Sequence, residues 1–176
     1  DYLFLQVSNC SVAGSDTISG QNYTGGFAGE TIGAVMTGCS VNDTESVNGT
    51  DYSGGFIGRA SNAVVAGALD HLGIQIADFP VNTVMLGCSI NGSANVSATG
   101  SSGKESGYAG GFIGEMRNSY AVDCSISSLG TVSGKDYTGG FAGLATLGAV
   151  TSIDENKGLL DLVKKLLTGL LNGNIT

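Results

Sequence analysis

The sequence is poor in charge, and its few basic residues are not clustered. Charged residues make up 12% of the 176 positions, and 15 acids against 7 bases give a formal net charge of −8. Binding to a nucleic-acid backbone requires grouped lysine and arginine side chains. An acidic chain with isolated bases is therefore not expected to bind nucleic acid.

Tryptophan is absent, and proline and histidine occur once each, as Pro80 and His71. No apolar run reaches the roughly 18 residues of a membrane-spanning helix, so no transmembrane segment is predicted. The chain begins at Asp1 without a methionine or a signal peptide, as expected for a mature product or an excised piece.

Glycine, by contrast, is abundant, with 30 residues. It follows no Gly-X-Y period, which excludes collagen, and an apolar fraction of 41% argues against disorder. The composition indicates a β-rich protein of small residues in which the backbone turns tightly or packs closely.

A motif, Tyr-x-Gly-Gly-Phe-x-Gly, occurs four times. Its central residues are Gly25, Gly26 and Phe27; Gly54, Gly55 and Phe56; Gly110, Gly111 and Phe112; and Gly139, Gly140 and Phe141. A phosphate-binding loop works once, at the start of a helix. Four copies at a constant phase instead indicate a structural repeat, with the glycines at a corner of a coil and the phenylalanines stacked in a column.

A second motif, Cys-Ser-Val/Ile, fixes the period of the repeat. Its cysteines are Cys10, Cys39, Cys88 and Cys124. Tyr23 and Tyr52 lie 29 residues apart, as do Tyr108 and Tyr137. The interval of 56 residues in between contains one repeat with insertions of 20 and 7 residues, near 59–83 and 98–105.

Three short extended pieces can be recognised in each 29-residue repeat: Gly-Gly-Phe-Ala/Ile-Gly, the segment around the cysteine, and a Val-x-Gly step. They predict an all-β fold, a parallel β-helix (β-solenoid) of about 4–5 coils over residues 1–153. Strict alternation places Val35, Thr37, Cys39 and Val41 inward, and Met36, Gly38 and Ser40 outward.

These motifs resemble the GLUG-type repeats of large microbial surface proteins and adhesins, over roughly residues 1–150. The resemblance departs at the phenylalanines, where the family usually has an aliphatic residue. It implies an extracellular, multi-repeat, β-solenoid-like module without catalysis, and it carries over no site residue.

The longer insertion includes residues 62–73, which could form a short helix, followed by an extended segment that leads to Pro80. Two interpretations remain open: a helix that patches an apolar strip, or a projecting ligand-binding element. The insertion within 98–105 is rich in serine and glycine and is predicted to be a flexible loop.

Residues 154–176 are predicted to form an amphipathic α-helix that caps the C-terminal end of the solenoid, with its leucines on one wide face. An open solenoid end exposes core and unpaired backbone, which a helical lid would cover. The alternative, a membrane-surface helix, would require more basic residues than Lys164 and Lys165.

The four cysteines hold the same phase and should form one inward row. Stacked Cβ atoms lie about 4.8 Å apart, which is longer than the roughly 3.8 Å between the Cβ atoms of a disulfide. Buried free thiols are therefore expected. Disulfides are the alternative, because the number of cysteines is even and the protein is expected to be secreted. No metal site and no cofactor are predicted, because His71 stands alone and no Cys-x-x-Cys pair exists.

No catalytic constellation is recognisable, and the chain is not expected to be an enzyme. His71 lies beside Asp70 without a nucleophile in register. Asp51 and Asp136 both precede the motif tyrosine and are interpreted as turn formers, with a calcium site as the alternative.

The pattern Asn-x-Ser/Thr occurs more often than chance predicts, which suggests glycan acceptors. The alternative is that β-turns are rich in these residues anyway. The positions are Asn9, Asn22, Asn42, Asn48, Asn91, Asn95 and Asn174.

Taken together, these features predict a non-catalytic extracellular or cell-surface module with a structural and adhesive role. Its partners would be neighbouring repeats, copies of itself that stack into a fibre, or host and matrix glycans and proteins. A carbohydrate-binding or polysaccharide-processing β-helix domain is the alternative, and a third possibility is a binding module that uses the insertion near 59–83.

Overall fold

The computed structural model describes residues 5–14, 16–65 and 79–147. Residues 1–63 and 80–147 form one compact unit, and residues 64–79 and 148–176 form a second unit. All the secondary structure of the described residues is β, and none of them is helical. The predicted capping helix at 154–176 lies outside the described residues.

Each repeat passes through four sheets in the order A, B, C, D. Sheet A comprises β1 (Leu5–Ser8), β6 (Ala34–Thr37), β13 (Thr83–Leu86) and β17 (Ser119–Val122). Sheet B comprises β2 (Ser11–Ala13), β3 (Thr17–Ser19), β7 (Ser40–Asn42), β8 (Ser46–Gly49) and the longer strands β14 (Ser89–Ala98) and β18 (Ser125–Gly134).

The other two sheets are formed by the residues on either side of each Gly-Phe. Sheet C comprises β4 (Tyr23–Gly25), β9 (Tyr52–Gly54), β15 (Tyr108–Gly110) and β19 (Tyr137–Gly139). Sheet D comprises β5 (Ala28–Ile32), β10 (Ile57–Ser61), β16 (Ile113–Arg117) and β20 (Ala142–Thr146).

Strands of neighbouring repeats pair in parallel and in register. Tyr52 lies opposite Tyr23 on one side and opposite Tyr108 on the other, although 56 residues separate the second pair. The insertions therefore do not disturb the alignment of equivalent positions. Parallel sheets with this register are compatible with the predicted solenoid.

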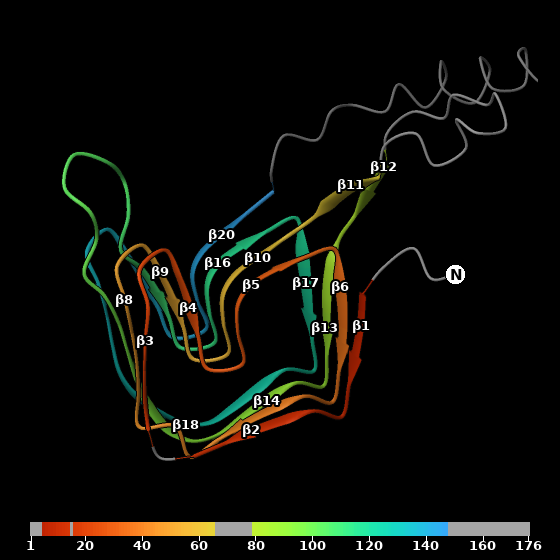
Figure 1. The fold of residues 1–176 in the computed structure, drawn as a ribbon, viewed down its shortest axis with the longest axis horizontal. Coiled ribbons are helices and arrows are strands. Elements are labelled where there is room, and N and C mark those ends of the chain that lie inside the picture. Colours follow the sequence, from red (N-terminus) through yellow and green to blue (C-terminus); the bar gives the residue numbers. More distant parts are fainter. Residues whose placement is uncertain (1–4, 15, 66–78, 148–176) are drawn as a thin grey trace, which may run out of the picture. The chain divides into compact units, whose positions relative to one another are not determined.

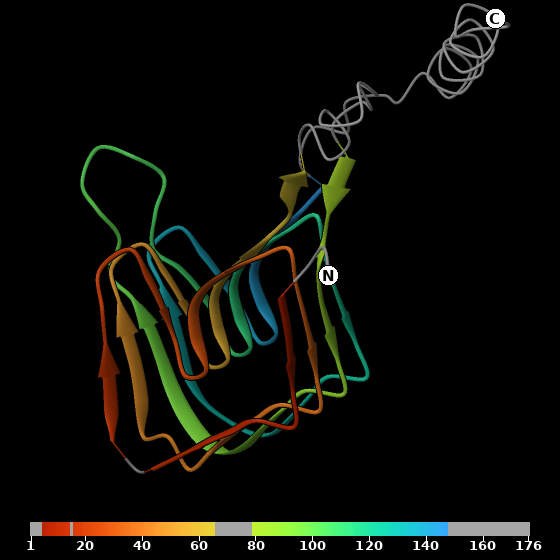
Figure 2. The same cartoon turned by 45° about the vertical axis from the view of Figure 1, so that its right-hand side comes forward.

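The motif is a bend between two strands, not one strand. In Figures 1 and 2 the chain descends through sheet C, turns, and rises through sheet D, so that the bend points between sheets A and B. The first repeat consequently has five short strands where three were predicted. The prediction of an extended Gly-Gly-Phe-x-Gly piece was wrong because the second glycine and the phenylalanine form the turn, whereas the predicted corner at the motif glycines agrees with this bend.

The predicted alternation around Cys39 was also partly wrong. Cys39 and Val41 are buried as predicted, but Met36 is buried too, whereas Thr37 is exposed. Gly38 has φ +61° and forms a corner between β6 and β7. A left-handed residue interrupts the pleat, so the two sides of the corner follow different phases.

The main core lies where the bends of sheets C and D meet sheets A and B. Its buried members are Met36, Cys39, Val41, Phe56, Ile57, Ala60, Met85, Cys88, Ile90, Phe112 and Ile113. A smaller cluster of Val96, Ala98 and Ala109 packs between sheet B and sheet C. Every one of these residues belongs to a position that recurs in several repeats.

The longer insertion begins with a strand. β11 (Ala63–Val65) pairs with β12 (Phe79–Val81) in a two-stranded sheet. The predicted helix over 62–73 was therefore wrong for its first residues, where β-branched valines favour a strand. Its remainder, with His71, lies outside the described residues, whereas the predicted extended segment before Pro80 is a strand at its described end.

Candidate functional site

The second glycine of each motif makes close stacking of the repeats possible. A Cβ atom on Gly26 would collide with the carbonyl oxygen of Gly55, one on Gly55 with that of Gly111, and one on Gly111 with that of Gly140. Backbone atoms cannot move aside as a flexible side chain can. In these three repeats only glycine fits, because the next repeat occupies the space.

The phenylalanines form a column along the stack. Neighbouring rings lie 4.9, 4.8 and 4.9 Å apart and are nearly parallel, with interplanar angles of 11°, 16° and 5°. Phe56 and Phe112 are fully buried, whereas Phe141, in the last repeat, is 37% exposed. The predicted column is confirmed.

The motif tyrosines form a second column, in sheet C. Their ring centroids are 5.2, 5.0 and 4.8 Å apart, and two of the three contacts are edge-to-face. Tyr108 is 5% exposed, and burial raises its pKa to about 12. This phenol therefore stays protonated at physiological pH and provides no base.

A cluster of charged residues that was not predicted from the sequence lies beside the tyrosine column. Arg59 Nη1 donates a hydrogen bond to the Tyr23 hydroxyl at 2.8 Å and lies 3.4 Å from Glu30 Oε1. Its Nε lies 3.1 Å from Glu115 Oε2, an ion pair without the geometry of a hydrogen bond. Arg117 Nη2 donates to Glu115 Oε1 at 2.7 Å.

Glu30, Arg59 and Glu115 occupy the same position of sheet D, directly after the last glycine of the motif. Opposite charges thus face each other across neighbouring strands. Glu115 is 1% exposed and is compensated by two arginines. The alternation of charge at one repeat position was the signal that could have revealed the cluster.

The cysteines occupy one position in successive repeats, and all four are free thiols. Cys39 and Cys88 are buried, Cys124 is half-buried and Cys10 is exposed. The Cys88 thiol lies 3.8 Å from the carbonyl oxygen of Met36 in the preceding repeat. Burial raises the pKa of Cys88 to about 11 and also raises that of Cys124, which makes both weak nucleophiles.

The shorter insertion is held by two aspartates. Ser101 Oγ donates to Asp51 Oδ1 at 2.7 Å, and Lys104 Nζ lies 3.0 Å from Asp51 Oδ2. The backbone N–H of Ser106 donates to Asp136 Oδ2 at 2.7 Å. The two aspartates predicted to form turns therefore anchor the loop of the third repeat.

Burial alone would raise the pKa of Asp51, but the hydrogen bonds from Ser101 and Lys104 outweigh it and hold the pKa below its usual value. Asp51 is therefore ionised and ion-paired at neutral pH. Among the described residues, no group of three or more His, Cys, Asp or Glu side chains is placed to hold a metal ion.

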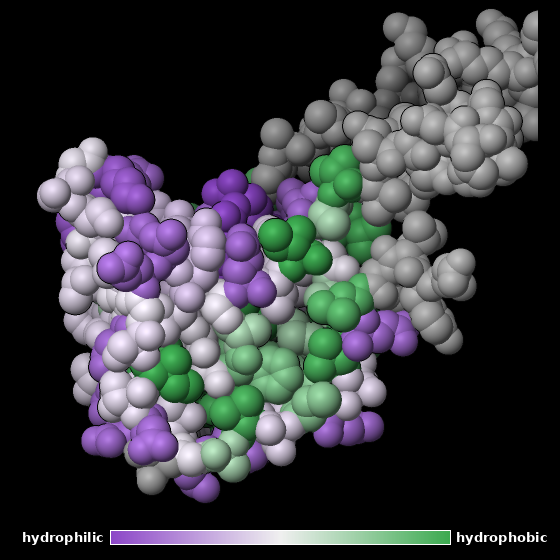
Figure 3. Space-filling view, viewed as in Figure 1, coloured by the Kyte–Doolittle hydropathy of each residue, from purple (hydrophilic) through white to green (hydrophobic). Residues whose placement is uncertain are grey.

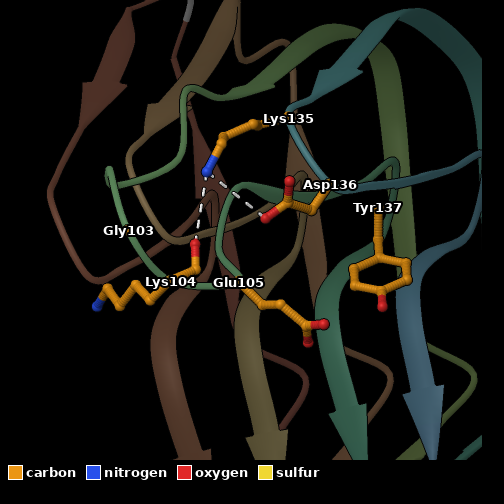
Figure 4. Close-up of a pocket in the computed structure, with 6 residues that line it drawn as sticks. All are labelled: Gly103, Lys104, Glu105, Lys135, Asp136 and Tyr137. Atoms are coloured by element: carbon orange, nitrogen blue, oxygen red, sulfur yellow. Dashed lines mark hydrogen bonds and ion pairs between the residues drawn. The ribbon is translucent and has the colours of Figure 1, made fainter.

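An open depression of about 630 Å³ lies between this loop and the last repeat (Figure 4). It is lined by Gly103, Lys104, Glu105, Lys135, Asp136 and Tyr137. Lys135 Nζ donates to the carbonyl oxygen of Ser101 at 2.9 Å and lies 3.7 Å from Asp136 Oδ2. With the Tyr137 ring 38% exposed, the depression combines an aromatic face with groups of both charges.

The outer face of sheet B carries uncharged polar side chains in rows. One row is Ser11, Ser40, Ser89 and Ser125, each opposite the next. In a neighbouring row, Asn91 Nδ2 donates to Asn42 Oδ1 at 2.9 Å. In another, Ser97 Oγ donates to Asn48 Oδ1 at 2.7 Å.

Four of the predicted glycan acceptors thus belong to sheet B: Asn42, Asn48, Asn91 and Asn95. Asn91 and Asn95 are exposed, and Asn42 and Asn48 are half-buried. Asn9 and Asn22 are also exposed, and Asn9 has φ +52° at a corner. Asn174 lies outside the described residues. Glycosylation remains a prediction.

No known protein family, no curated protein and no solved structure matches this chain. The resemblance to GLUG-type repeats therefore stays a prediction. Within the described residues, no helix has the length and apolarity required to cross a bilayer.

Proposed function

We propose that the chain is a non-catalytic, extracellular structural and adhesive module, built as a parallel β-solenoid. The observation that carries the proposal is the in-register pairing of equivalent strands across four repeats, with columns of phenylalanine, tyrosine and cysteine. Such a stack is rigid and presents side chains at regular intervals on its outer faces. Those properties suit a scaffold or an adhesive surface.

The polar groups of the stack support a structural role. Glu115 and Asp51 are engaged in ion pairs with arginine and lysine. A carboxylate compensated in this way stabilises the native arrangement and is not free to act as a general base. The buried thiol of Cys88, with its raised pKa, is likewise a packing group.

The register can be tested with spin labels on the outer face of sheet B. In a background with Cys10 and Cys124 changed to serine, labels replace Ser40 and Ser89, which lie opposite each other. We expect strong dipolar broadening at a spacing of about 4.8 Å. The control pair at Ser11 and Ser125 spans three strand spacings, about 14 Å, and should show weak broadening. Equal spectra would contradict the stacked repeats.

Adhesion can be tested with beads coated with the intact chain and exposed, under flow, to surfaces bearing host glycoproteins or matrix polysaccharides. Retention of the beads is expected for the native chain and not for the Phe56→Ala variant, in which the core column is broken. Release of sugar fragments from the polysaccharide surface by the native chain would instead indicate a polysaccharide-processing enzyme.

A second candidate function, carbohydrate binding, is favoured by the depression beside Tyr137. An exposed aromatic ring in one depression with Glu105 and Asp136 offers a stacking face together with hydrogen-bonding groups. Titration with a panel of oligosaccharides tests it: Tyr137→Ala should weaken binding roughly tenfold. Tyr120→Ala, which alters an exposed tyrosine of sheet A, should have no effect. Equal loss in both variants would exclude this site.

A further inference from the structure

At each end of the stack, the outermost strands have one edge without a partner strand among the described residues. The strands of the last repeat, β17 to β20, contain no charged residue, and those of the first repeat, β1 to β5, contain one, Glu30. Natural proteins usually guard such edges with charge, proline or bulges, because unpaired backbone groups recruit further strands. Both ends are therefore chemically suited to accept another repeat.

Core positions are exposed at both ends. In the first repeat, Val12 is 36% exposed, although its counterpart Val41 is fully buried; in the last repeat, Leu129 is 44% and Phe141 is 37% exposed. Figure 3 has the first repeat nearest the viewer and shows apolar residues gathered across the middle of that face, with polar residues around them. In the part of the chain that the structure describes, each end thus presents core positions that no further repeat covers.

Gly140 indicates what kind of neighbour fits. In the three preceding repeats the second glycine is required because the carbonyl oxygen of the next motif lies against it. A Cβ atom on Gly140 would meet only Leu129 Cδ2, at 3.7 Å, among the described residues. Nothing in the described part of the molecule therefore requires glycine here. The position is already shaped for one more motif of the same kind.

Residues 144–176 contain no further Tyr-x-Gly-Gly-Phe motif. The first repeat of another molecule does contain it, and its Gly26 and Phe27 stand at the opposite end of the stack. A second copy of the chain therefore supplies the matching surface, and it repeats the contact that already joins neighbouring repeats within the chain.

We propose that the last repeat of one molecule stacks on the first repeat of a second copy. Gly140 then lies against the carbonyl oxygen of Gly26 of the second copy, and the Phe141 ring covers its Phe27. This inference rests on the solenoid architecture of the proposed function. Because the two contacting surfaces are different, the contact leaves both outer ends free and extends into an open filament.

The first test compares the wild type with Gly140→Ala by sedimentation velocity and electron microscopy, under reducing conditions that keep Cys10 free. The wild type should associate as its concentration rises and form filaments one molecule wide. Gly140→Ala should remain monomeric with an unchanged melting temperature, since its methyl group is tolerated within the molecule but blocks the neighbouring carbonyl.

Leu86→Ser is the matched control. Leu86 lies on the outer face of sheet A, in the third repeat, and is 37% exposed, as Phe141 is. Its substitution should leave association unchanged. If Leu86→Ser abolishes association while Gly140→Ala does not, the molecules associate sideways and the proposal is wrong.

A mixing experiment tests the polarity of the contact. Val12→Lys places a charge at the first repeat, and Gly140→Ala blocks the last repeat. Each variant alone should be monomeric, whereas an equimolar mixture should form dimers and stop there. A mixture that remains monomeric would overturn head-to-tail stacking.

Two further outcomes would refute the proposal. A wild type that stays monomeric at the highest attainable concentration would refute head-to-tail stacking. The spin-label pair at Ser40 and Ser89 would then show separately whether the proposed solenoid architecture still holds. A Gly140→Ala variant with a melting temperature lowered as much as that of Gly55→Ala would show that the chain's own residues cover this end.

Discussion

The inner and the outer repeats of this molecule have nearly the same motif but different surroundings. Phe56 and Phe141 occupy the same position of the phenylalanine column, yet Phe56 is fully buried and Phe141 is 37% exposed. Cys88 is buried, whereas Cys10, at the same position in the first repeat, is exposed. Burial of a residue in this fold is therefore set by its neighbours along the stack and not by its own repeat.

The largest contrast is expected at the second glycine of the motif. Gly55→Ala places a methyl group against the carbonyl oxygen of Gly111 and close to the Ile90 side chain. The backbone cannot retreat without separating two repeats, so we expect a loss of roughly 4 kcal/mol or more in the free energy of unfolding. Urea denaturation monitored by circular dichroism measures it.

Gly140→Ala is the matched control, and dilute monomeric protein is used for both. Its methyl group has room, so the free energy of unfolding should change by less than about 0.5 kcal/mol. If the two variants were equally destabilised, the glycines would be required by local backbone conformation and not by the neighbouring repeat.

The phenylalanine column should show the next largest contrast. Phe56→Ala removes a fully buried ring and leaves a cavity between two other rings, so we expect a loss of about 3–5 kcal/mol in the free energy of unfolding. Phe141→Ala removes a ring that is partly in water, and a loss of about 1–2 kcal/mol is expected. Equal losses, measured by the same denaturation, would mean that the last repeat is covered.

Asp51 and Asp136 provide a pH-dependent contrast of smaller size. The pKa of Asp51 is lowered in the folded state, so the folded state binds its proton less readily than the unfolded state does. Its stabilisation is present above the unfolded pKa of about 3.9 and is lost as the pH falls through the folded pKa. At neutral pH, Asp51→Asn should lower stability by about 2 kcal/mol.

The test is urea denaturation of wild type and Asp51→Asn between pH 7 and pH 3, where the difference between them should shrink as the pH falls. Asp136→Asn is the comparison variant, because Asp136 occupies in the last repeat the position that Asp51 occupies in the second repeat. It retains an acceptor oxygen for the Ser106 N–H and should lower stability less. A difference between wild type and Asp51→Asn that stays constant with pH would contradict the role of the ionised Asp51 carboxylate.

The smallest contrast is one of chemical reactivity: the thiols at the same position of different repeats should react at different rates in the native protein. Cys10 is exposed, whereas Cys88 is buried and its pKa is raised to about 11. In a titration of the native protein with a chromogenic disulfide reagent at pH 8, Cys10 should react within the first phase. Cys88 should react only when denaturant opens the stack. Cys88→Ser should lower by one the number of thiols that react only in denaturant, with Cys39 still among them. Rapid reaction of all four thiols in the native protein would contradict the inward row.

Periodicity alone predicted a large part of the fold. The recurrence of the motif at one phase predicted that Phe27, Phe56, Phe112 and Phe141 stack in a column, and their rings do so. It also predicted that the insertions leave the register intact. The reason is that a parallel stack pairs equivalent positions, so a constant phase in sequence becomes a straight column in space.

Predictions that relied on local pattern were less successful. The prediction assumed that inward and outward residues alternate without interruption through Gly38. The left-handed backbone of Gly38 changes this alternation, so the prediction that Met36 faces outward was wrong. A glycine in a sequence does not reveal the sign of its φ, since it adopts either. The valines at 64 and 65 suited a helix by apolar spacing, but β11 forms a strand because a partner strand is available.

The candidate sites depended still more on tertiary structure. The ion pairs of Glu30, Arg59 and Glu115 join strands 29 and 56 residues apart, and the loop of Ser101 and Lys104 is held by Asp51, about 50 residues earlier. Single residues of this kind carry no motif. Their significance follows from which strands become neighbours.

The sequence by itself determined the period, the parallel pairing of equivalent positions and the columns of repeated residues, because regular repetition leaves one register that buries all copies together. Only the tertiary structure decided that a further corner lies at Gly38, which glycines are indispensable and which copies of a residue are buried. Those properties depend on atoms of the neighbouring repeat. Gly55 and Gly140 are the same residue in the same motif, and only the repeat above Gly55 distinguishes them.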